Sequence, residues 1–411
     1  MEISLRPRSS GLQCANSSEA SPRPLRPCGG IHHAQNAAFL AVLMSEICRR
    51  LLRQNAVLRE SVAREFATLP LAHPRFETVM RTYEREVLMA IDKNDATLTQ
   101  IFGRPAQGSA LAHAADWLGL SERPETYDCL GSLWRHLAKD WSRDGVAGTE
   151  ELRSLIVTGV ASEMSRWPAD ERMRVLVPGC GQGRLAWALA DALPHALVTG
   201  LERSEATLEF ARHVLHGVGE IASVQFHPFL DAFPNNWDAK SRTASFSVPD
   251  VLPRPAPNLA LQLADFMEPH ALRDEDDNSI SWTALRSRSV PTSTQWRPPW
   301  HQQQHHVVCT HFFLDCVDDV VAGCTAVRDA LVDGGAWIFS GPLHYHQGGG
   351  YTPRPSPALS HLLELASDLG LEPEGPPLLV PSPYLPRPNA LLHEAAWTAA
   401  FFKARKRRGP S

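Results

Sequence analysis

Apolar residues recur at helical spacing along the first quarter of the chain. From Asn36 to Phe102 they alternate with charged residues, as in SEICRRLLRQNAVLRESVAREFATL and FETVMRTYEREVLMAIDKNDATLTQIF. This period is typical of helices that bury one face. Pro70 and Pro74 interrupt the pattern, so it predicts at least two helices, and Tyr127–Trp141 predicts a third.

The pattern changes at Arg174, where short apolar runs begin to alternate with helical stretches. Such an order predicts an α/β fold whose parallel strands are joined by right-handed helical crossovers. The expected strands are Arg174–Pro178, Leu197–Leu201, Ala222–Phe226, Asn258–Leu263, His306–Phe313 and Ala336–Ser340, and the expected helices are Arg184–Leu193, Glu205–His216 and Val317–Leu331.

These patterns divide the chain into a disordered tail (1–35), a helical region (36–150), an α/β domain (151–405) and a basic tail (406–411). Residues 270–305 interrupt the α/β domain with an acidic cluster and a Gln/His run, which favours a disordered insertion. Its histidines lack the ligand spacing of a defined metal site. The Arg- and Ser-rich first thirty residues leave a transit peptide as the alternative to a plain tail.

Composition narrows the class of protein. A chain of 411 residues with 43% hydrophobic residues can bury a large core, and its net charge of −5 is not that of a general nucleic-acid binder. The longest apolar run, Ala37–Met44, is far shorter than the ~18 residues of a membrane span. Eight cysteines without a CxxC pair favour a reducing compartment, so we expect the cytoplasm, with the nucleus as an alternative because KARKRR could be a localisation signal.

A glycine turn provides the first sign of function. In RVLVPGCGQGRL, an apolar strand runs into Gly179, Gly181 and Gly183 and then into a helix. Glycines let a cofactor approach the backbone, and a helix N-terminus offers unpaired N–H groups. The GxGxG spacing differs from the GxGxxG of dinucleotide sites and is typical of S-adenosylmethionine enzymes, which disfavours a Rossmann-type dehydrogenase.

Acidic residues at two further strand ends extend this hypothesis. Glu202 closes the second strand, where a carboxylate can accept hydrogen bonds from ribose hydroxyls; its alternative role is to cap a helix. Asp265 and Phe266 close a later strand, where an acid can accept from an adenine amino group and its neighbour can flank the base. Carboxyl ends of parallel strands share one sheet edge, so we expect one pocket there.

Six motifs in a fixed order make the reading more specific. They are RVLVPGCGQGRLAWALA, HPFLDAFPNN, SVPDVLP, LADF, HFFLD and GPLHYH. In this order they resemble the carnosine N-methyltransferase family, also called the N2227-like family, over about residues 60–405 apart from the insertion. The resemblance implies a Rossmann-like class I methyltransferase sheet with an N-terminal helical layer and S-adenosylmethionine as cofactor. It also implies an imidazole dipeptide as methyl acceptor, in a reaction of the type that converts carnosine to anserine.

The resemblance also assigns roles to individual residues. His136 and Lys139 of RHLAKDWS stand where the family usually has Gln and Arg to hold the methionine carboxylate, and Lys lacks the bidentate fork of Arg. The other cofactor positions are Gly179, Glu202, Asp265, Phe266 and His311, the last at a place where the family often has Cys. The substrate positions are Asp315 and His346, with Trp397 near positions where the family has tyrosines.

Methyl transfer from a sulfonium needs a nitrogen lone pair in line with the methyl carbon. A carboxylate that accepts from the N–H of an imidazole fixes its tautomer and stabilises the cation that forms. Asp315 is expected to do this and His346 to orient the ring or relay the proton, with a helix cap and a structural loop histidine as their alternatives.

The expected partner is a small imidazole dipeptide, with no nucleic acid and no membrane, and a homodimer is left open. Two other functions compete with this reading. One is methylation of a protein histidine or another small imidazole, since Trp397 departs from the family pattern. The other is a protein that binds the cofactor without transferring its methyl group.

Overall fold

The computed structural model describes residues 29–67, 74–105, 129–168, 170–233, 236, 238–267, 289–291, 303–345, 356–383, 385 and 397–408. Its helices are α1 (Gly29–Ala67), α2 (Pro74–Phe102), α4 (Leu130–Trp141), α5 (Arg143–Glu163), α6 (Arg184–Ala192), α7 (Glu205–Arg212), α8 (Ala239–Arg242), α10 (Val320–Ala330) and α11 (Leu359–Asp368). Shorter turns are η1 (Met164–Arg166), η2 (His213–Gly217) and η4 (Leu314–Cys316). None of the described helices is both long and apolar enough to cross a bilayer.

Most strands belong to one nine-stranded sheet with the order β10-β11-β8-β7-β1-β2-β5-β6, and β9 pairs with β11. They are β1 (Arg174–Pro178), β2 (Leu197–Glu202), β5 (Leu259–Leu263), β6 (Ser289–Pro291), β7 (His305–His311), β8 (Leu331–Gly341), β9 (Leu371–Pro373), β10 (Leu378–Ser382) and β11 (Trp397–Lys406). The five central strands β5, β2, β1, β7 and β8 are parallel, whereas β6 and β11 run antiparallel to their neighbours. The predicted α/β class of sheet, with its N-terminal helical layer, is confirmed.

The strand order reverses between β1 and β7. The chain builds outward from β1 through β2 to β5 and then returns to add β7 and β8 on the other side of β1. Loops that leave β1 and β7 therefore diverge and open a crevice at the carboxyl edge of the sheet. The elements expected to bind a cofactor end at this edge.

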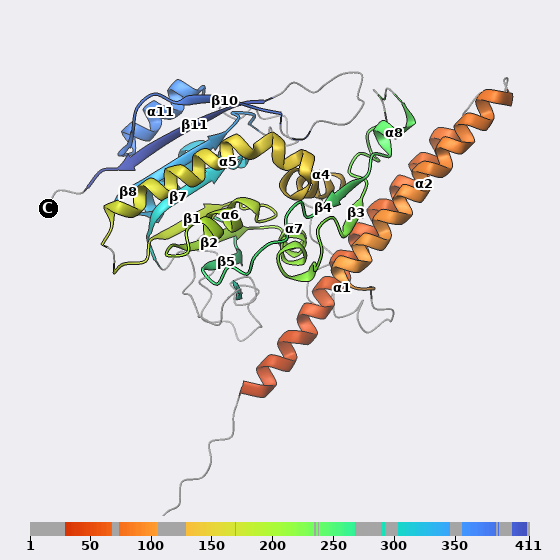
Figure 1. Ribbon diagram of the computed structural model, residues 1–411, viewed down its shortest axis with the longest axis horizontal. Helices are drawn as coiled ribbons and strands as arrows, with labels where there is room; N and C mark the ends of the chain where they lie inside the picture. Colours follow the sequence, from red (N-terminus) through yellow and green to blue (C-terminus); the bar gives the residue numbers. More distant parts are fainter. Residues whose placement is uncertain are drawn as a thin grey trace, which may run out of the picture.

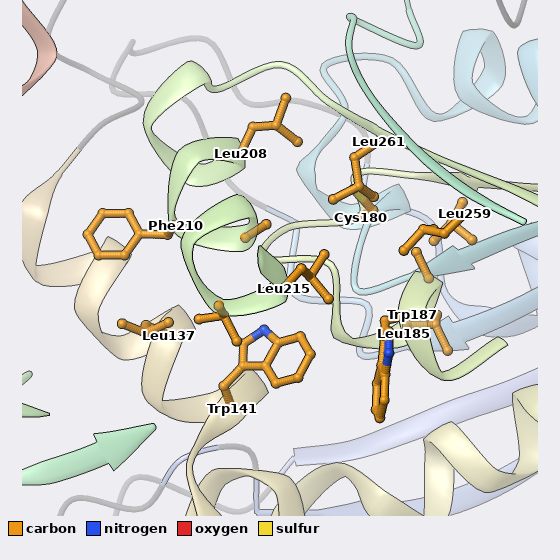
Figure 2. Close-up of a cluster of buried hydrophobic side chains, with 14 of the residues drawn as sticks. Leu137, Trp141, Cys180, Leu185, Trp187, Leu208, Phe210, Leu215, Leu259 and Leu261 are labelled. Carbon is orange, nitrogen blue, oxygen red and sulfur yellow. The ribbon is translucent and has the colours of Figure 1, made fainter. Parts of the chain in front are cut away.

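The sheet is buried on both faces, as the continuous apolar runs predicted. In β1, Val175 and Val177 pack with α4, α6 and α7, whereas Leu176 packs on the opposite face with residues of α10 and α11. Figure 1 shows α5 lying across the strands of the first face, with α11 at the far edge beyond β11. Figure 2 shows the core of the first face, where Trp141 of α4 lies near Trp187 of α6, and Phe210 of α7 lies on the other side of Trp141, beside Leu137.

The N-terminal layer is a pair of long helices beside the sheet (Figure 1). On α2 the buried residues recur at helical spacing, as expected for a helix with one packed face. Asn94 lies on that face and exchanges two hydrogen bonds with the backbone of His227, at 2.9 Å and 2.8 Å. These polar bonds fix the helical layer to the end of β3 (Val224–Phe226).

Several sequence predictions need correction. Residues 222–226 were expected to join the parallel sheet, but β3 pairs antiparallel with β4 (Phe246–Val248) in a separate two-stranded sheet. The expected helix 317–331 starts at Val320 and ends at Ala330, because Leu331 already begins β8. Most of the stretch 270–305 lies outside the described residues, but 289–291 form β6 and His305 begins β7. The boundary drawn at residue 150 falls within α5.

The basic run KARKRR is not a solvated tail for most of its length. Lys403 and Arg405 lie in β11 and bind the buried carboxylate of Glu163 on α5, at 2.8 Å and 2.9 Å, and both also contact Glu374. We call Glu163, Lys403, Arg405 and Glu374 the Glu163 cluster. It joins α5 to the edge of the sheet and holds these cations within the fold.

Candidate active site

The glycine turn follows β1 and leads into α6. Gly179, Gly181 and Gly183 have φ angles of +58°, +56° and +82°, a region that favours glycine. A Cβ on Gly179 would lie 2.3 Å from Cδ2 of Phe313, so only a glycine permits this close approach. Gly183 faces the core instead, where a Cβ would meet Leu261 at 3.4 Å.

Helix α4 is hydrogen-bonded to this turn through Gln182. The indole N–H of Trp141 donates to the carbonyl of Gln182 at 2.9 Å, and the side-chain amide of Gln182 donates to the carbonyl of Leu133 at 2.9 Å. Both bonds are buried, where they are stronger than in water. The motif WRHLAKDWS therefore positions the turn as well as the polar side chains of α4.

Glu202 is at the end of β2, next to the turn. Its Oε2 accepts from the backbone N–H of Gly181 at 3.2 Å, and its Oε1 accepts from the N–H of Ser204 at 2.9 Å. Burial raises the pKa of this carboxyl group, although the backbone donors oppose the shift. Each carboxylate oxygen has a further lone pair, so the group can also accept from a bound hydroxyl.

Asp265 and Phe266 follow β5 at the same edge of the sheet. Asp265 accepts from the backbone N–H of Met267 at 2.8 Å, and the guanidinium of Arg203 lies 3.9 Å from its other oxygen. The Phe266 ring is buried and packs edge-on against Phe313, with 5.9 Å between centroids. The turn after β5 is thereby connected to the glycine turn through Phe313.

A cavity of about 950 Å³ opens at this edge and brings most of the predicted site residues together. Its lining includes His136, Lys139, Gly179, Gly181, Glu202, Asp265, Phe266, His311, Asp315 and Trp397. Gly183 is not part of the lining, since it faces the core. His346 lies outside the described residues.

Asp315 lies beyond β7, in η4, and is 6% exposed. Burial raises the pKa of its carboxyl group to about 6, and backbone N–H groups, including that of His344, oppose the shift. A carboxylate with this pKa is ionised at neutral pH and can still gain a proton during a reaction. Asp315 therefore presents to the cavity a carboxyl group that can change its protonation state near neutral pH.

Aromatic rings lie at the same end of the cavity as Asp315. The ring centroids of His344 and Trp397 are 4.7 Å apart, and both residues line the cavity. The strand pairing of β8 and β11 brings these residues together across the sheet edge. His344 lies in the motif GPLHYH, and only the tertiary structure shows that it stands beside Trp397.

His311 ends β7, is half-buried and lines the cavity. Burial, followed by the charges of Lys139 and Arg153, lowers its pKa to about 3. Its Nδ1 lies 2.6 Å from the hydroxyl of Ser340. The next residue, Phe312, has φ +49°, a strained value for a side-chain-bearing residue, so the end of β7 is a specialised turn.

The sequence did not indicate all residues of this wall. Arg153 and Thr149 of α5 line the cavity, as do Asp140, Phe312 and Phe313. No motif points to α5, whose apolar spacing resembles that of any core helix. Phe312 and Phe313 lie within HFFLD and could have been inferred to flank the site.

The cavity residues fit a nucleoside cofactor that carries an amino-acid group. The glycine turn exposes backbone, Glu202 presents oxygens next to it, and Lys139 of α4 supplies a buried cation to the same cavity. Among the residues that the structure describes, no group of three or more His, Cys, Asp or Glu side chains is placed to hold a metal ion.

Comparisons with known proteins point to one family. A family model described as carnosine N-methyltransferase matches residues 121–408. The carnosine N-methyltransferase of Schizosaccharomyces pombe is 27% identical over 225 residues, which cover 53% of this chain and 52% of that protein. The Mus musculus carnosine N-methyltransferase is 27% identical over 224 residues, covering 53% of this chain and 48% of that protein.

The chain thus spans about half the length of the curated relatives it matches. Among solved structures, magnesium protoporphyrin IX methyltransferase from Synechocystis PCC 6803 with bound S-adenosylmethionine is 12% identical, with a TM-score of 0.36. That match covers 70% of this chain and 96% of the other chain. The matched region of the family model contains every described residue of the cavity.

Proposed function

Because the chain belongs to the carnosine N-methyltransferase family, we propose that it is an S-adenosylmethionine-dependent N-methyltransferase acting on the imidazole of a histidine-containing dipeptide, as in carnosine to anserine. The observation that carries the proposal is Asp315, a buried carboxylate in the same cavity as the glycine turn and Glu202. A cofactor site and an acid suited to an imidazole N–H thus share one enclosed space.

The places of the proposed cofactor residues at the cavity wall support the roles that the resemblance assigns to them. Glu202 would accept from the ribose hydroxyls, Asp265 from the adenine amino group, and Phe266 would contact the base. Lys139 and His136 of α4 would bind the methionine group. The peptide backbone of the turn at Gly179 and Gly181 would face the cofactor. When bound, S-adenosylmethionine supplies an electrophilic methyl group on a sulfonium.

Asp315 acts on the acceptor. Its carboxylate accepts from one N–H of the imidazole, which leaves the other nitrogen with its lone pair free to attack. That lone pair would form the new N–C bond to the methyl group that the cofactor supplies, and the electrons of the broken C–S bond would stay on the cofactor. The ring becomes an imidazolium, and its N–H proton passes to Asp315, whose pKa of about 6 suits it to take up and then release a proton.

Aromatic side chains define the rest of the acceptor site. Trp397 and His344 present ring surfaces beside Asp315, and stacking on such surfaces restrains a planar imidazole. We include His346, two residues beyond His344, as a further substrate-binding histidine. Trp397 is the specific feature that favours the second candidate, a larger or different histidine-containing acceptor.

The test is a methyl-transfer assay with purified protein. Incubation with S-adenosylmethionine and carnosine should give a product heavier by one methyl group, detected by mass spectrometry, and Asp315→Asn should form it far more slowly. Methylation of a histidine-containing protein but not of carnosine would support the second candidate. Cofactor binding by calorimetry without turnover on any imidazole would contradict both, and binding of NAD in place of S-adenosylmethionine would contradict the whole reading.

A further inference from the structure

Arg153 is a buried cation that no sequence motif marks. It lies on α5, is 7% exposed, and lines the cavity together with Thr149 one turn earlier. Buried arginines occur where a negative partner is fixed near them, because an unpaired guanidinium loses its hydration at high cost. A negative group is therefore expected close to the guanidinium of Arg153.

The charges around it are only partly matched inside the protein. Arg184 donates to both oxygens of Asp250, at 2.7 Å and 3.0 Å, and Lys139 lies 3.2 Å from Asp140. These four residues form two buried pairs.

Arg153 contacts Glu150, whose side chain is 56% exposed. Water screens an ion pair of that kind, so it contributes little. The wall of the cavity therefore carries a cation whose counter-charge is largely in solvent.

The electrostatic environment of Arg153 is consistent with its incomplete pairing. Burial, and then the charge of Arg184, lower the pKa of Arg153 to about 10, while Asp140 and Asp250 act in the opposite direction. The positive charges of Lys139 and Arg153 both reach His311 at the end of β7. An anion that entered the cavity would relieve this positive potential.

Helix α5 packs on both α4 and β10. Its first turn packs on α4, where a Cβ on Gly145 would meet the backbone of Lys139 at 2.5 Å. Farther along, the carbonyl of Gly148 accepts from the hydroxyl of Ser382 at 3.2 Å, and Ser382 pairs with Trp397 in the sheet. Arg153 thus lies on a helix that contacts α4, which carries Lys139, and β10, which pairs with the strand of Trp397.

We propose that Arg153 binds a carboxylate group inside the cavity. A guanidinium offers a planar fork of donors that matches the two oxygens of a carboxylate, which Lys139 cannot do. Under the proposed function two ligands bring such a group, the histidine dipeptide and the methionine part of the cofactor. If the dipeptide is the source, Arg153 selects free dipeptides over histidines within a protein chain, because only the former carry a carboxylate beside the imidazole.

The acceptor arm compares carnosine with its C-terminal amide. Wild-type kcat/KM should favour carnosine by about 10- to 100-fold, the range expected for a hydrogen bond to a charged group. Arg153→Gln should reduce carnosine to the level of the amide, through KM, while S-adenosylhomocysteine affinity stays the same. Arg143→Gln, an exposed arginine of the same helix outside the cavity lining, is the matched control and should change neither value.

The cofactor arm uses calorimetry and needs no turnover. If the methionine carboxylate is the source, Arg153→Gln should weaken S-adenosylhomocysteine by about 10- to 100-fold but leave 5′-methylthioadenosine, which has no amino-acid group, unchanged. This arm also separates the inference from the proposed function, since it still reports on Arg153 if no imidazole is methylated.

Arg153→Lys keeps the charge and removes the fork, so it replaces Arg153→Gln if that variant fails to fold, with a smaller loss expected in the same arm. Folded Arg153 variants that match wild type in both arms would overturn the proposal. So would a wild-type enzyme that does not distinguish carnosine from its amide, if S-adenosylhomocysteine affinity is also indifferent to Arg153.

Discussion

Replacing Gly179 by Ala tests the close approach on which the glycine turn depends. A residue with a side chain at φ +58° costs about 1–2 kcal/mol of backbone strain. Its Cβ would also lie 2.3 Å from Cδ2 and 3.1 Å from Cε2 of Phe313. Ordinary carbon contacts begin near 3.5 Å, so the ring must move by about 1 Å, and overpacking of that kind costs about 1–3 kcal/mol. Gly179→Ala should lower the free energy of unfolding by about 2–5 kcal/mol.

Gly103→Ala is the matched control for strain alone. Gly103 has φ +79°, and a Cβ there would have nothing within 4 Å. It should cost only about 1–2 kcal/mol. Urea unfolding at constant m-value measures both losses.

Phe313→Ala should remove the excess cost of Gly179→Ala in a double-mutant cycle. Equal losses for Gly179→Ala and Gly103→Ala, or a cycle with no coupling to Phe313, would refute the reasoning.

Three further predictions follow from the carboxylates. Burial raises the pKa of Asp315 to about 6, and the ionised form is the active one, so activity should fall as the pH drops below that value. The acid limb of log kcat/KM should be steeper by one proton in wild type than in the residual activity of Asp315→Asn. Equal slopes of the two acid limbs would argue against the role of Asp315. Although burial alone would raise it, hydrogen bonds within the Glu163 cluster lower the pKa of Glu163, so its stabilisation is present at neutral pH and is lost as pH falls through that lowered value. Glu163→Gln should cost about 3–5 kcal/mol in urea unfolding, against less than about 1 kcal/mol for Glu372→Gln in an exposed pair, and similar values would contradict a buried cluster. Glu202→Gln leaves an amide N–H₂ facing one of two backbone donors, so S-adenosylhomocysteine affinity should fall about tenfold or more by calorimetry, and unchanged affinity would exclude this carboxylate from the cofactor site.

Much of the fold was predictable because its signals are local. The apolar run before Gly179, the glycine turn and Glu202 lie within thirty residues, and β1, α6 and β2 form there as expected. Parallel strands place their carboxyl ends at one edge, so a site at that edge followed from the strand order alone. The cavity brings Glu202, Asp265 and Asp315 together on this principle.

Other predictions failed where pairing between distant segments decides the outcome. Residues 222–226 have the composition of a sheet strand, but they pair with 246–248 and fix the helical layer through Asn94. The run Lys403–Arg408 has the composition of a basic tail, but the pairing of β11 with β8 and the carboxylate of Glu163, both far away in sequence, make most of it part of the fold.

The sequence by itself determined the class of sheet, the turn that can receive a nucleoside cofactor, and the acids at the strand ends, because backbone geometry and strand direction act over a few residues. The tertiary structure decided which other side chains share their cavity. Arg153 carries no local signal, and the motif that contains His344 does not show which rings it meets; they reach the site because α5 packs across the strands and β11 pairs with β8. A buried charge or a stacked ring is defined by its neighbours in space, and these come from segments that the chain brings together only on folding.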